Sequence, residues 1–247
     1  MSILEAVYWD LDGTIANTEL EAHLPAFNKS FKYFDIDWYW DKDTYISLLK
    51  INGGRNRISY FSNIKCQKFE DDLIKEIHKT KQSFYLEYIK KGAVSLKKGV
   101  YRIIKELYAN NVKQFIVTSS SRIQVETLIE KLFNGLNPFD FFVCSEDVIL
   151  HKPDPSPYNL AIKLSGIKKE NSIVFEDSYP GLQSSLSAGL PTICVKTNIP
   201  INFGDNHISC LVDSLGESDH PTNFLIGPNH KSKFIDYRYL TNFLKEY

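Results

Sequence analysis

The sequence predicts an α/β protein: a Rossmann-like parallel sheet covered by helices on both faces, with a second, helical domain inserted into it. Short apolar, β-branched runs occur at 3–9, 114–117, 141–144, 172–175 and 191–195. Helical patterns separate most of these runs, at 101–108, 123–133, 158–164 and 182–188. Strands that alternate with helices indicate right-handed crossovers and a parallel sheet.

The stretch between the first two strands predicts the inserted domain. It is about a hundred residues long, far more than one crossover needs. Four segments in it have helical patterns, at 19–34, 44–49, 55–61 and 71–89. We therefore expect a helical domain over residues 17–93 and a discontinuous core domain over residues 1–16 and 94–247. A cap that emerges just after the first strand is placed to act as a lid.

Two further regions carry weaker structural signals. In the cap, Trp38, Tyr39 and Trp40 are expected to form part of the core. Beyond Pro200, residues 209–215 suggest a short strand or a turn, and 234–244 a closing helix. The intervening stretch 216–233 is rich in Ser, Pro, Asn and Gly and predicts a loop.

Composition limits the partners and the compartment. The formal net charge of the 247 residues is −1, so that no overall basic field recommends nucleic acid. No apolar stretch is long enough to span a bilayer, and the first strand begins too early to leave room for a signal peptide. The four cysteines lie far apart without a C-x-x-C pair, and Cys144 and Cys194 lie in apolar strand-like runs, which is typical of buried thiols in a reducing compartment. We expect a cytoplasmic monomer that binds neither nucleic acid nor membrane.

Two aspartates mark the end of the first strand. In YWDLDGTIANTE, Asp10 and Asp12 lie two positions apart and point the same way, and Gly13 allows a sharp turn. Two close carboxylates repel unless they share a proton or bind a cation, and hard oxygen ligands suit Mg²⁺. Asp and Gly are also common turn residues, so that the motif by itself leaves an ordinary turn open.

Three later segments add polar groups to the same edge. Thr118 ends the second strand, before a capping box at Ser121 and Gln124. Lys152 stands in a proline-rich loop, HKPDPSP, where its ammonium could meet a phosphate or simply be solvated. Glu176 and Asp177 follow the fourth strand as a second acidic pair, either as metal ligands or as favourable charges at a helix start. Together these groups predict one site: a metal between two acidic strand ends, beside a phosphate.

The order of these motifs resembles the haloacid dehalogenase superfamily. The motifs are D-x-D-G-T, a strand ending in Thr-Ser, then K-P, and then E-D within F-E-D-S-x-x-G-x-x-x-x-x-x-A-G, in order over about residues 3–195. The helical insert looks like the four-helix cap of that superfamily. The resemblance implies Mg²⁺-dependent phosphoryl transfer through an aspartyl phosphate.

A narrower resemblance points to one branch. The segments DGTIANTELEAHLPAFNKSF, DWYWDKDTYISLLKINGGRNR and LVDSLGE look like the CbbY branch, which is close to β-phosphoglucomutase. That branch includes phosphatases that act on xylulose-1,5-bisphosphate, so the resemblance implies a phosphorylated sugar as the substrate.

The resemblance also implies roles for the core residues. Asp10 would be the nucleophile, and Asp12 the general acid and base, lending its backbone carbonyl to the metal. Asp177 would complete the metal ligands, with Glu176 as a further ligand or a neighbour of one. The equatorial phosphate oxygens would be stabilised by the polar groups Thr118, Ser119 and Lys152.

The cap would select the substrate. Glu19 and His23 lie four apart on its first helix, near the hinge. Further candidates are Tyr45, Gly54, Arg55 and Arg57. Two arginines beside a Gly-Gly pair could clamp the second phosphate of a bisphosphate, although the same residues are also typical of a solvated helix start.

Three alternatives remain open at this stage. A phosphoglucomutase-like mutase would use the same motifs and return the phosphoryl group to the sugar. A dehalogenase is disfavoured, because the departure of a halide needs no acid at Asp12. A catalytically silent binding protein is disfavoured by the presence of Asp10, Asp12, Lys152 and Asp177 together.

Overall fold

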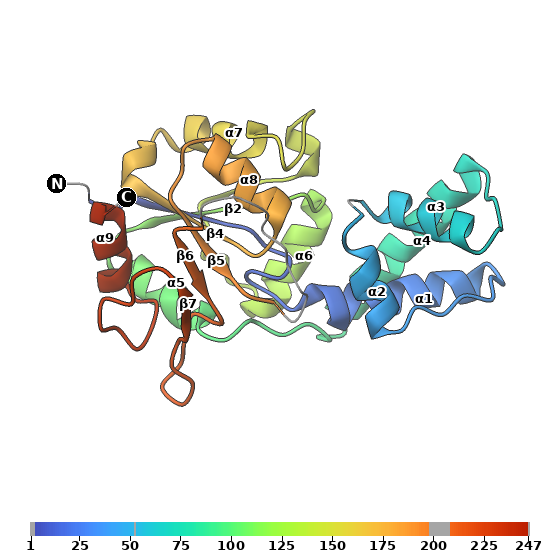
Figure 1. Ribbon diagram of the computed structural model, residues 1–247, viewed down its shortest axis with the longest axis horizontal. Helices are drawn as coiled ribbons and strands as arrows, with labels where there is room; N and C mark the ends of the chain where they lie inside the picture. The colour runs from blue at the N-terminus through green and yellow to red at the C-terminus, as the bar shows by residue number, and fades with distance from the viewer. Residues whose placement is uncertain (1–2, 52, 198–207, 247) are drawn as a thin grey trace. The chain divides into compact units, whose positions relative to one another are not determined.

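The computed structural model describes residues 3–51, 53–197 and 208–246. The chain forms two compact units, Met1–Asn17 with Leu96–Tyr247, and Thr18–Ser95. The first unit holds the sheet, and the second is built from helices (Figure 1).

One twisted sheet organises the first unit. Its strands in the described residues are β1 (Ala6–Trp9), β2 (Lys113–Val117), β3 (Phe141–Val143), β4 (Ser172–Glu176), β5 (Thr192–Val195), β6 (Cys210–Val212) and β7 (Phe224–Ile226). Their order is β3-β2-β1-β4-β5-β6-β7. Every neighbouring pair is parallel except β6 and β7. The predicted Rossmann-like parallel sheet is confirmed.

The strand order places a switch point between β1 and β4. The chain moves from β1 through β2 to β3 on one side, and then returns to build β4, β5 and β6 on the other. In open α/β sheets the crevice at the carboxyl ends of such a strand pair is the preferred ligand site. Asp10 and Asp177 directly follow these two strands, so that the topology brings the two acidic pairs to one place.

Helices cover both faces of the sheet (Figure 1). The helices α7 (Ser156–Ser165) and α8 (Tyr179–Ser187) lie over one face, and α5 (Val100–Ala109) and α9 (Tyr237–Glu246) over the other. The remaining helix of eight or more residues described in this unit is α6 (Arg122–Leu132), and two short 3₁₀ turns cover Ser145–Asp147 and Lys169–Asn171. All four residues of β1 are buried, as expected for a strand with helices on both sides.

Alternation along β1 divides the core. Tyr8 points toward the face of α7, where it packs with Phe115, Val174 and Tyr158. Trp9 points the opposite way and stacks on Phe175, with 4.4 Å between the ring centroids. Burial of the indole would leave its N–H without water, and it donates instead to Oε1 of Gln114 at 3.2 Å. The bulky residues of β1 therefore fix the strand that carries Asp10.

Local signals set the helix starts that border the sheet edge. The side chain of Ser178 accepts from the backbone N–H of Gly181 and begins α8, with Pro180 in the first turn. The expected capping box at Ser121 and Gln124 begins α6. Both helices thus start within a few residues of a strand that ends at the same edge.

The C-terminal region partly departs from the sequence prediction. The run at 209–215 contains β6, and the closing helix is α9. The predicted loop at 216–233 is wrong in part, because β7 lies within it. Leu225 and Ile226 of this edge strand are each 42% exposed. A three-residue edge strand with so little burial leaves no apolar run in the sequence.

The second unit is built from helices joined by shorter connections. It begins with a π-helical turn, η1 (Glu19–His23), which continues as α1 (Leu24–Tyr33). It also holds α2 (Lys42–Leu48), α3 (Gly54–Ile64) and α4 (Asp71–Lys90). Trp38 and Trp40 lie in its core, whereas Tyr39 is 78% exposed, so that its predicted burial is wrong. In an extended segment, alternate side chains face opposite ways.

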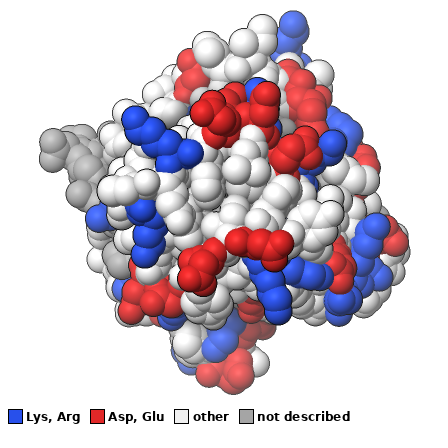
Figure 2. All heavy atoms as spheres, turned by 90° about the vertical axis from the view of Figure 1, so that its right-hand side faces the viewer, with Lys and Arg blue, Asp and Glu red and all other residues white. Residues whose placement is uncertain are grey.

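The described residues show neither a membrane-spanning helix nor a surface of one charge on the face drawn in Figure 2. No helix among the described residues is both long enough and apolar enough to cross a membrane. On the face drawn in Figure 2, basic and acidic side chains are interspersed with uncharged ones rather than separated by sign. This matches the near-zero net charge of the chain.

Candidate active site

Asp10 is buried at the carboxyl end of β1. Its backbone N–H donates to the carbonyl of Phe175 at 3.0 Å, which continues the pairing with β4. The side chain is held by one oxygen, since Oδ1 accepts from Nζ of Lys152 at 2.8 Å. The other oxygen, Oδ2, is buried and has no hydrogen-bond partner among the described residues. A buried carboxylate oxygen without a partner is costly, and it is commonly reserved for a ligand or a reaction.

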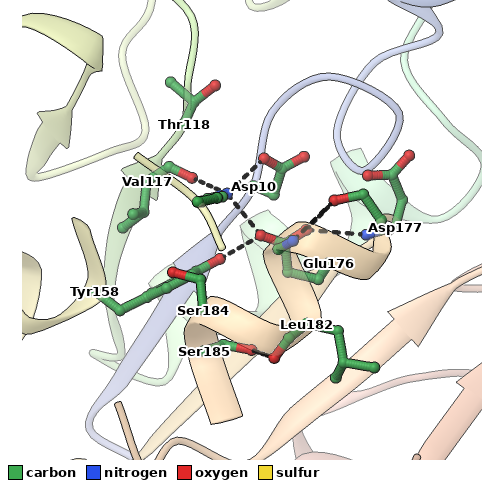
Figure 3. A network of polar contacts seen from close by, with 12 residues as sticks. Asp10, Val117, Thr118, Tyr158, Glu176, Asp177, Leu182, Ser184 and Ser185 are labelled. Atoms are coloured by element: carbon green, nitrogen blue, oxygen red, sulfur yellow. Dashed lines mark hydrogen bonds and ion pairs between the residues drawn. The ribbon is translucent and has the colours of Figure 1, made fainter. Parts of the chain in front are cut away.

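Lys152 connects three parts of the site, and its partners Asp10, Val117 and Glu176 are labelled in Figure 3. Its Nζ donates to Oδ1 of Asp10, to the carbonyl of Val117 at 2.8 Å, and to Oε1 of Glu176 at 2.6 Å. The side chain is only 5% exposed, so that it is not a solvated surface lysine. A buried ammonium between two carboxylates is a fixed positive charge at the ends of β1, β2 and β4.

The charged groups of this cluster shift one another's pKa values. Burial raises the pKa of Asp10 to about 7, and the negative charge of Glu176 adds to the rise, while Lys152 opposes it. Burial by itself would lower the pKa of Lys152, but Asp10 and Glu176 outweigh it and the pKa lies above its usual value. The lysine is therefore charged, and a further cation near Asp10 would favour its ionised form.

Glu176 is fully buried and holds Lys152 in place. Its Oε1 accepts from Lys152 and also from the hydroxyl of Tyr158, each at 2.6 Å. Its Oε2 accepts longer hydrogen bonds, at 3.3 Å, from the backbone N–H of Asp177 and from Oγ of Ser178. Tyr158 could not be predicted as a site residue, because a tyrosine in an apolar helix pattern is typical of core packing.

The acidic residues fit a metal ion. Asp10, Glu176 and Asp177 each offer one ligand oxygen, and these atoms lie within 4.8 Å of one another. Gly13 has φ of +87°, and a Cβ built on it would lie 1.9 Å from Oδ2 of Asp177. The glycine thus leaves room for a carboxylate that a larger residue would displace. A set of ligand atoms that are all oxygens suits a hard divalent cation.

The segment after β2 supplies hydroxyl groups. Thr118 is buried, and its Oγ1 accepts from the backbone N–H of Ser120 at 3.1 Å. Ser119 is exposed. Oγ of Ser120 donates to Oδ2 of Asp12 at 2.6 Å. The structure therefore brings Asp12 to this segment through Ser120, a residue that was not among the predicted site residues.

Lys97 is a second lysine near the carboxylates. It is half-buried, and its Nζ donates to the carbonyl of Lys196 at 3.1 Å. Burial lowers the pKa of Lys97, whereas the charges of Asp177 and Asp10 oppose the shift. The sequence offered no signal for Lys97, which stands in a run with Lys98 that reads as a solvated linker.

Within the helical unit, two of the predicted substrate residues meet. The hydroxyl of Tyr45 donates to Oε2 of Glu19. The guanidinium of Arg57 lies 5.9 Å from the centre of the Tyr45 ring, and its Nε donates to the carbonyl of Ile51 at 2.9 Å. Arg55 is exposed on the first turn of α3.

His23 belongs to a second group in that unit. Its Nδ1 lies 2.6 Å from Nζ of Lys81, which is 3% exposed, and its ring stacks on Tyr85. A Cβ built on Gly54 would lie 2.6 Å from Nε2 of His78. The pKa of His78 is lowered to about 4, first by burial and then by the charges of Lys81, Arg55, His23 and Arg57. The unit therefore concentrates positive charge around Gly54, and the sequence analysis did not identify Lys81 or His78.

Comparison with known proteins places the chain. Residues 7–195 match the family model of haloacid dehalogenase-like hydrolases. Protein CbbY of Rhodobacter capsulatus is 34% identical over 192 residues, which cover 77% of this chain and 84% of that protein.

Solved structures show the same relationship. CbbY of Rhodobacter sphaeroides in complex with phosphate superposes with a TM-score of 0.76 at 29% identity, covering 86% of this chain and 95% of that one. A mutant of the same protein in complex with xylulose-(1,5)bisphosphate gives a TM-score of 0.75 with the same identity and coverage. The family model matches residues 7–195, and the similar proteins are named CbbY. The chain therefore belongs to the haloacid dehalogenase-like hydrolase family and is an enzyme.

Proposed function

We propose that this chain is a Mg²⁺-dependent phosphatase that hydrolyses a sugar bisphosphate, xylulose-1,5-bisphosphate, through a phosphorylated Asp10. The observation that carries this proposal is the state of Asp10. One of its oxygens is anchored by Lys152 at 2.8 Å, and the other is buried without a hydrogen-bond partner among the described residues. An anchored carboxylate with one open oxygen is prepared for attack on phosphorus.

The reaction divides into two transfers. Oδ2 of Asp10 forms a bond to phosphorus while the bond from phosphorus to the sugar oxygen breaks, and Asp12 gives a proton to the departing oxygen. In the second transfer, Asp12 takes a proton from water, whose oxygen attacks phosphorus and releases Asp10. One acid that becomes a base in the next step accounts for the aspartate pair two residues apart.

The remaining core residues act on charge. Lys152 and Thr118 lie at the same sheet edge as Asp10 and would stabilise the equatorial phosphate oxygens. Glu176 holds Lys152 toward Asp10 through its Oε1. A divalent cation held by Asp10, Asp177 and the backbone carbonyl of Asp12 would offset the negative charge shared by the attacking and the attacked groups.

The helical unit supports a second phosphate on the substrate. Arg55, Arg57 and Lys81 lie near His78, whose pKa their charges lower, and the ring of His78 lies against Gly54 at the start of α3. Guanidinium groups bind phosphate through paired hydrogen bonds, so that this group suits the distal phosphate of a bisphosphate. Glu19 and Tyr45 are proposed to bind sugar hydroxyl groups. The complex of a CbbY relative with xylulose-(1,5)bisphosphate supports the choice of sugar.

Phosphate release from a panel of sugar phosphates tests the proposal. The panel contains xylulose-1,5-bisphosphate, ribulose-1,5-bisphosphate and β-glucose-1-phosphate, each with Mg²⁺ and with EDTA. We expect the highest kcat/KM on xylulose-1,5-bisphosphate and no turnover in EDTA. If monophosphates are turned over as fast as xylulose-1,5-bisphosphate, the proposed substrate is wrong. Conversion of β-glucose-1-phosphate to its 6-phosphate isomer indicates a mutase. Activity that persists in EDTA contradicts the metal.

Two variants separate the chemistry from the recognition. Asp10→Asn is expected to abolish turnover while the circular dichroism spectrum remains that of the wild type. The pair Arg55→Ala and Arg57→Ala should lower kcat/KM for bisphosphates by about 10²-fold or more and affect monophosphates less, because a charged hydrogen bond contributes about 1.5–3 kcal/mol. The exposed Arg238→Ala is the control for the loss of an arginine.

A further inference from the structure

Ser120 makes a contact that the proposed roles do not use. Its hydroxyl donates to Oδ2 of Asp12 at 2.6 Å, a short distance for a hydrogen bond to a carboxylate. The two residues are 108 positions apart in the chain, and they meet because β1 and β2 are parallel neighbours in the sheet. A contact that links the ends of two core strands is set by the fold rather than by local sequence.

The backbone of Ser120 is held on both sides. Its N–H donates to Oγ1 of Thr118 at 3.1 Å, and its carbonyl accepts from the N–H of Ser145 at 3.0 Å. The residue is half-buried. Because these hydrogen bonds fix the backbone of Ser120, they also fix the position of its side chain relative to Asp12.

The neighbouring serines have other positions. Ser119 is exposed, and Ser121 begins α6 with the capping box to Gln124. Three consecutive serines thus lie in three different environments. Ser120 differs from both neighbours in that its hydroxyl donates to a carboxylate of the expected reaction.

We infer that Ser120 is a positioning residue for Asp12, holding Oδ2 so that Oδ1 is the oxygen that exchanges a proton with the leaving group. In the first transfer, the proton moves from Oδ1 of Asp12 to the sugar oxygen as its bond to phosphorus breaks. In the second, the same oxygen takes a proton from the attacking water. Because the acid–base task of Asp12 belongs to the function proposed above, the role of Ser120 rests on that function.

The acidity of the leaving group separates positioning from structure. 4-Nitrophenol is acidic enough that its anion departs without a proton. A sugar alcohol or unsubstituted phenol is a weaker acid, so that its oxygen needs a proton as it departs. The value of kcat/KM covers the steps up to the first irreversible transfer, so that it reports the protonation of the leaving group. We therefore compare kcat/KM for 4-nitrophenyl phosphate, phenyl phosphate and xylulose-1,5-bisphosphate.

The expected result for Ser120→Ala is uneven. The value of kcat/KM should fall by about 10- to 100-fold on phenyl phosphate and the bisphosphate, as part of the 10²–10⁴-fold effect of a general acid, and by less than about 3-fold on 4-nitrophenyl phosphate. Ser120→Thr keeps the hydroxyl and should recover most of the loss. In an Asp12→Asn background, Ser120→Ala should change kcat/KM on phenyl phosphate by less than about 2-fold, because the two residues act together.

Each other outcome has a definite meaning. Suppose that the wild type hydrolyses all three esters and that Ser120→Ala loses the same factor of kcat/KM on each. This result overturns the role of Ser120 and leaves the proposed function intact. The same holds if Ser120→Ala adds its full effect to Asp12→Asn. A wild type that hydrolyses none of the three esters with Mg²⁺ overturns the proposed function and the role of Ser120 with it. Thermal melting checks that each variant is folded.

Discussion

The hydroxyl of Tyr158 donates to Oε1 of Glu176 at 2.6 Å, on the same oxygen that accepts from Lys152 (Figure 3). Both Tyr158 and Glu176 are fully buried. Burial raises the pKa of Tyr158 well above its usual value, and the charge of Glu176 raises it further, so that the phenol stays a donor. The pair thus supports the position of Lys152 from the side of the sheet core.

We predict that Tyr158→Phe lowers the free energy of unfolding by about 1–3 kcal/mol, since a buried carboxylate loses one of its donors. Urea denaturation checks this change. The control is Tyr108→Phe, at a tyrosine that is 75% exposed, which should change the free energy of unfolding by less than about 0.5 kcal/mol. Equal effects of the two substitutions would show that the Tyr158 hydroxyl contributes no special stabilisation.

Two glycines with similar backbones differ in their surroundings. Gly13 has φ of +87° and Gly135 has φ of +81°. A Cβ on Gly13 would lie 1.9 Å from Oδ2 of Asp177, whereas a Cβ on Gly135 would meet nothing within 4 Å. We predict that Gly135→Ala costs about 1 kcal/mol of stability from backbone strain alone, with activity unchanged.

Gly13→Ala should carry the same strain and also displace Asp177. We expect its kcat for phosphate release to fall at least about 10²-fold, because a small misplacement of a catalytic group has an effect of that order. Measurement of kcat and of thermal stability for both variants separates strain from displacement. A Gly13→Ala enzyme with the activity of Gly135→Ala contradicts the close packing of Asp177 against the turn.

Removal of the metal should be visible in stability. A ligand that binds only the folded protein stabilises it by about 2.7 kcal/mol at a hundred times its dissociation constant. We predict that Mg²⁺ raises the melting temperature of the wild type and that EDTA reverses the rise. Asp177→Asn should abolish the response, while Asp72→Ala, at a side chain that is 95% exposed, should keep it. A rise of equal size in Asp177→Asn would exclude Asp177 as a ligand.

His78 makes the stability of the helical unit depend on pH. Its pKa in the folded protein is about 4, below the usual 6.5, because of burial and then of the charges around it. Between these values the unfolded chain binds a proton that the folded chain does not, so that stability falls as the pH falls from about 6.5 to 4.

We predict that His78→Gln flattens this dependence by about 1–2 kcal/mol over that range, which is less than the full linkage because the side chain is partly exposed. Urea denaturation at pH 4.5 and 7 measures the change. The same substitution at the exposed His151 is the control and should leave the dependence as in the wild type. A dependence that is identical in His78→Gln would mean that other groups cause it.

Much of the sheet could be predicted because its strands are apolar and short and are separated by helix patterns. The strands that carry Asp10 and Glu176 are buried on both faces, which leaves continuous apolar runs in the sequence. The strand β7 could not be predicted, since its residues are half-buried or exposed. The π-helical turn at Glu19–His23 also left no pattern of its own, because five residues are too few to distinguish it from an α-helix.

The site could be predicted as a set of acidic and basic groups at one edge of the sheet, but not as a network. The side chains of Asp10, Lys152 and Asp177 follow from their places after strands and in a rigid loop. The partners Tyr158 and Ser120 do not, because a tyrosine in a core helix and one serine of three carry no local signal. Their contacts depend on which way a side chain turns once the elements have packed.

The long separations within the site have a consequence for synthesis of the chain. Lys152 and Asp10 are 142 positions apart, and Trp9 and its partner Gln114 are 105 apart. Pairings of this kind form late, because a long loop must close before they contribute stability. A growing polypeptide on the ribosome therefore carries the first aspartates from the start but gains the means to use them only when the strand ending at Glu176 has emerged. Fragments that stop short of that strand should be catalytically inert even where their helices have formed.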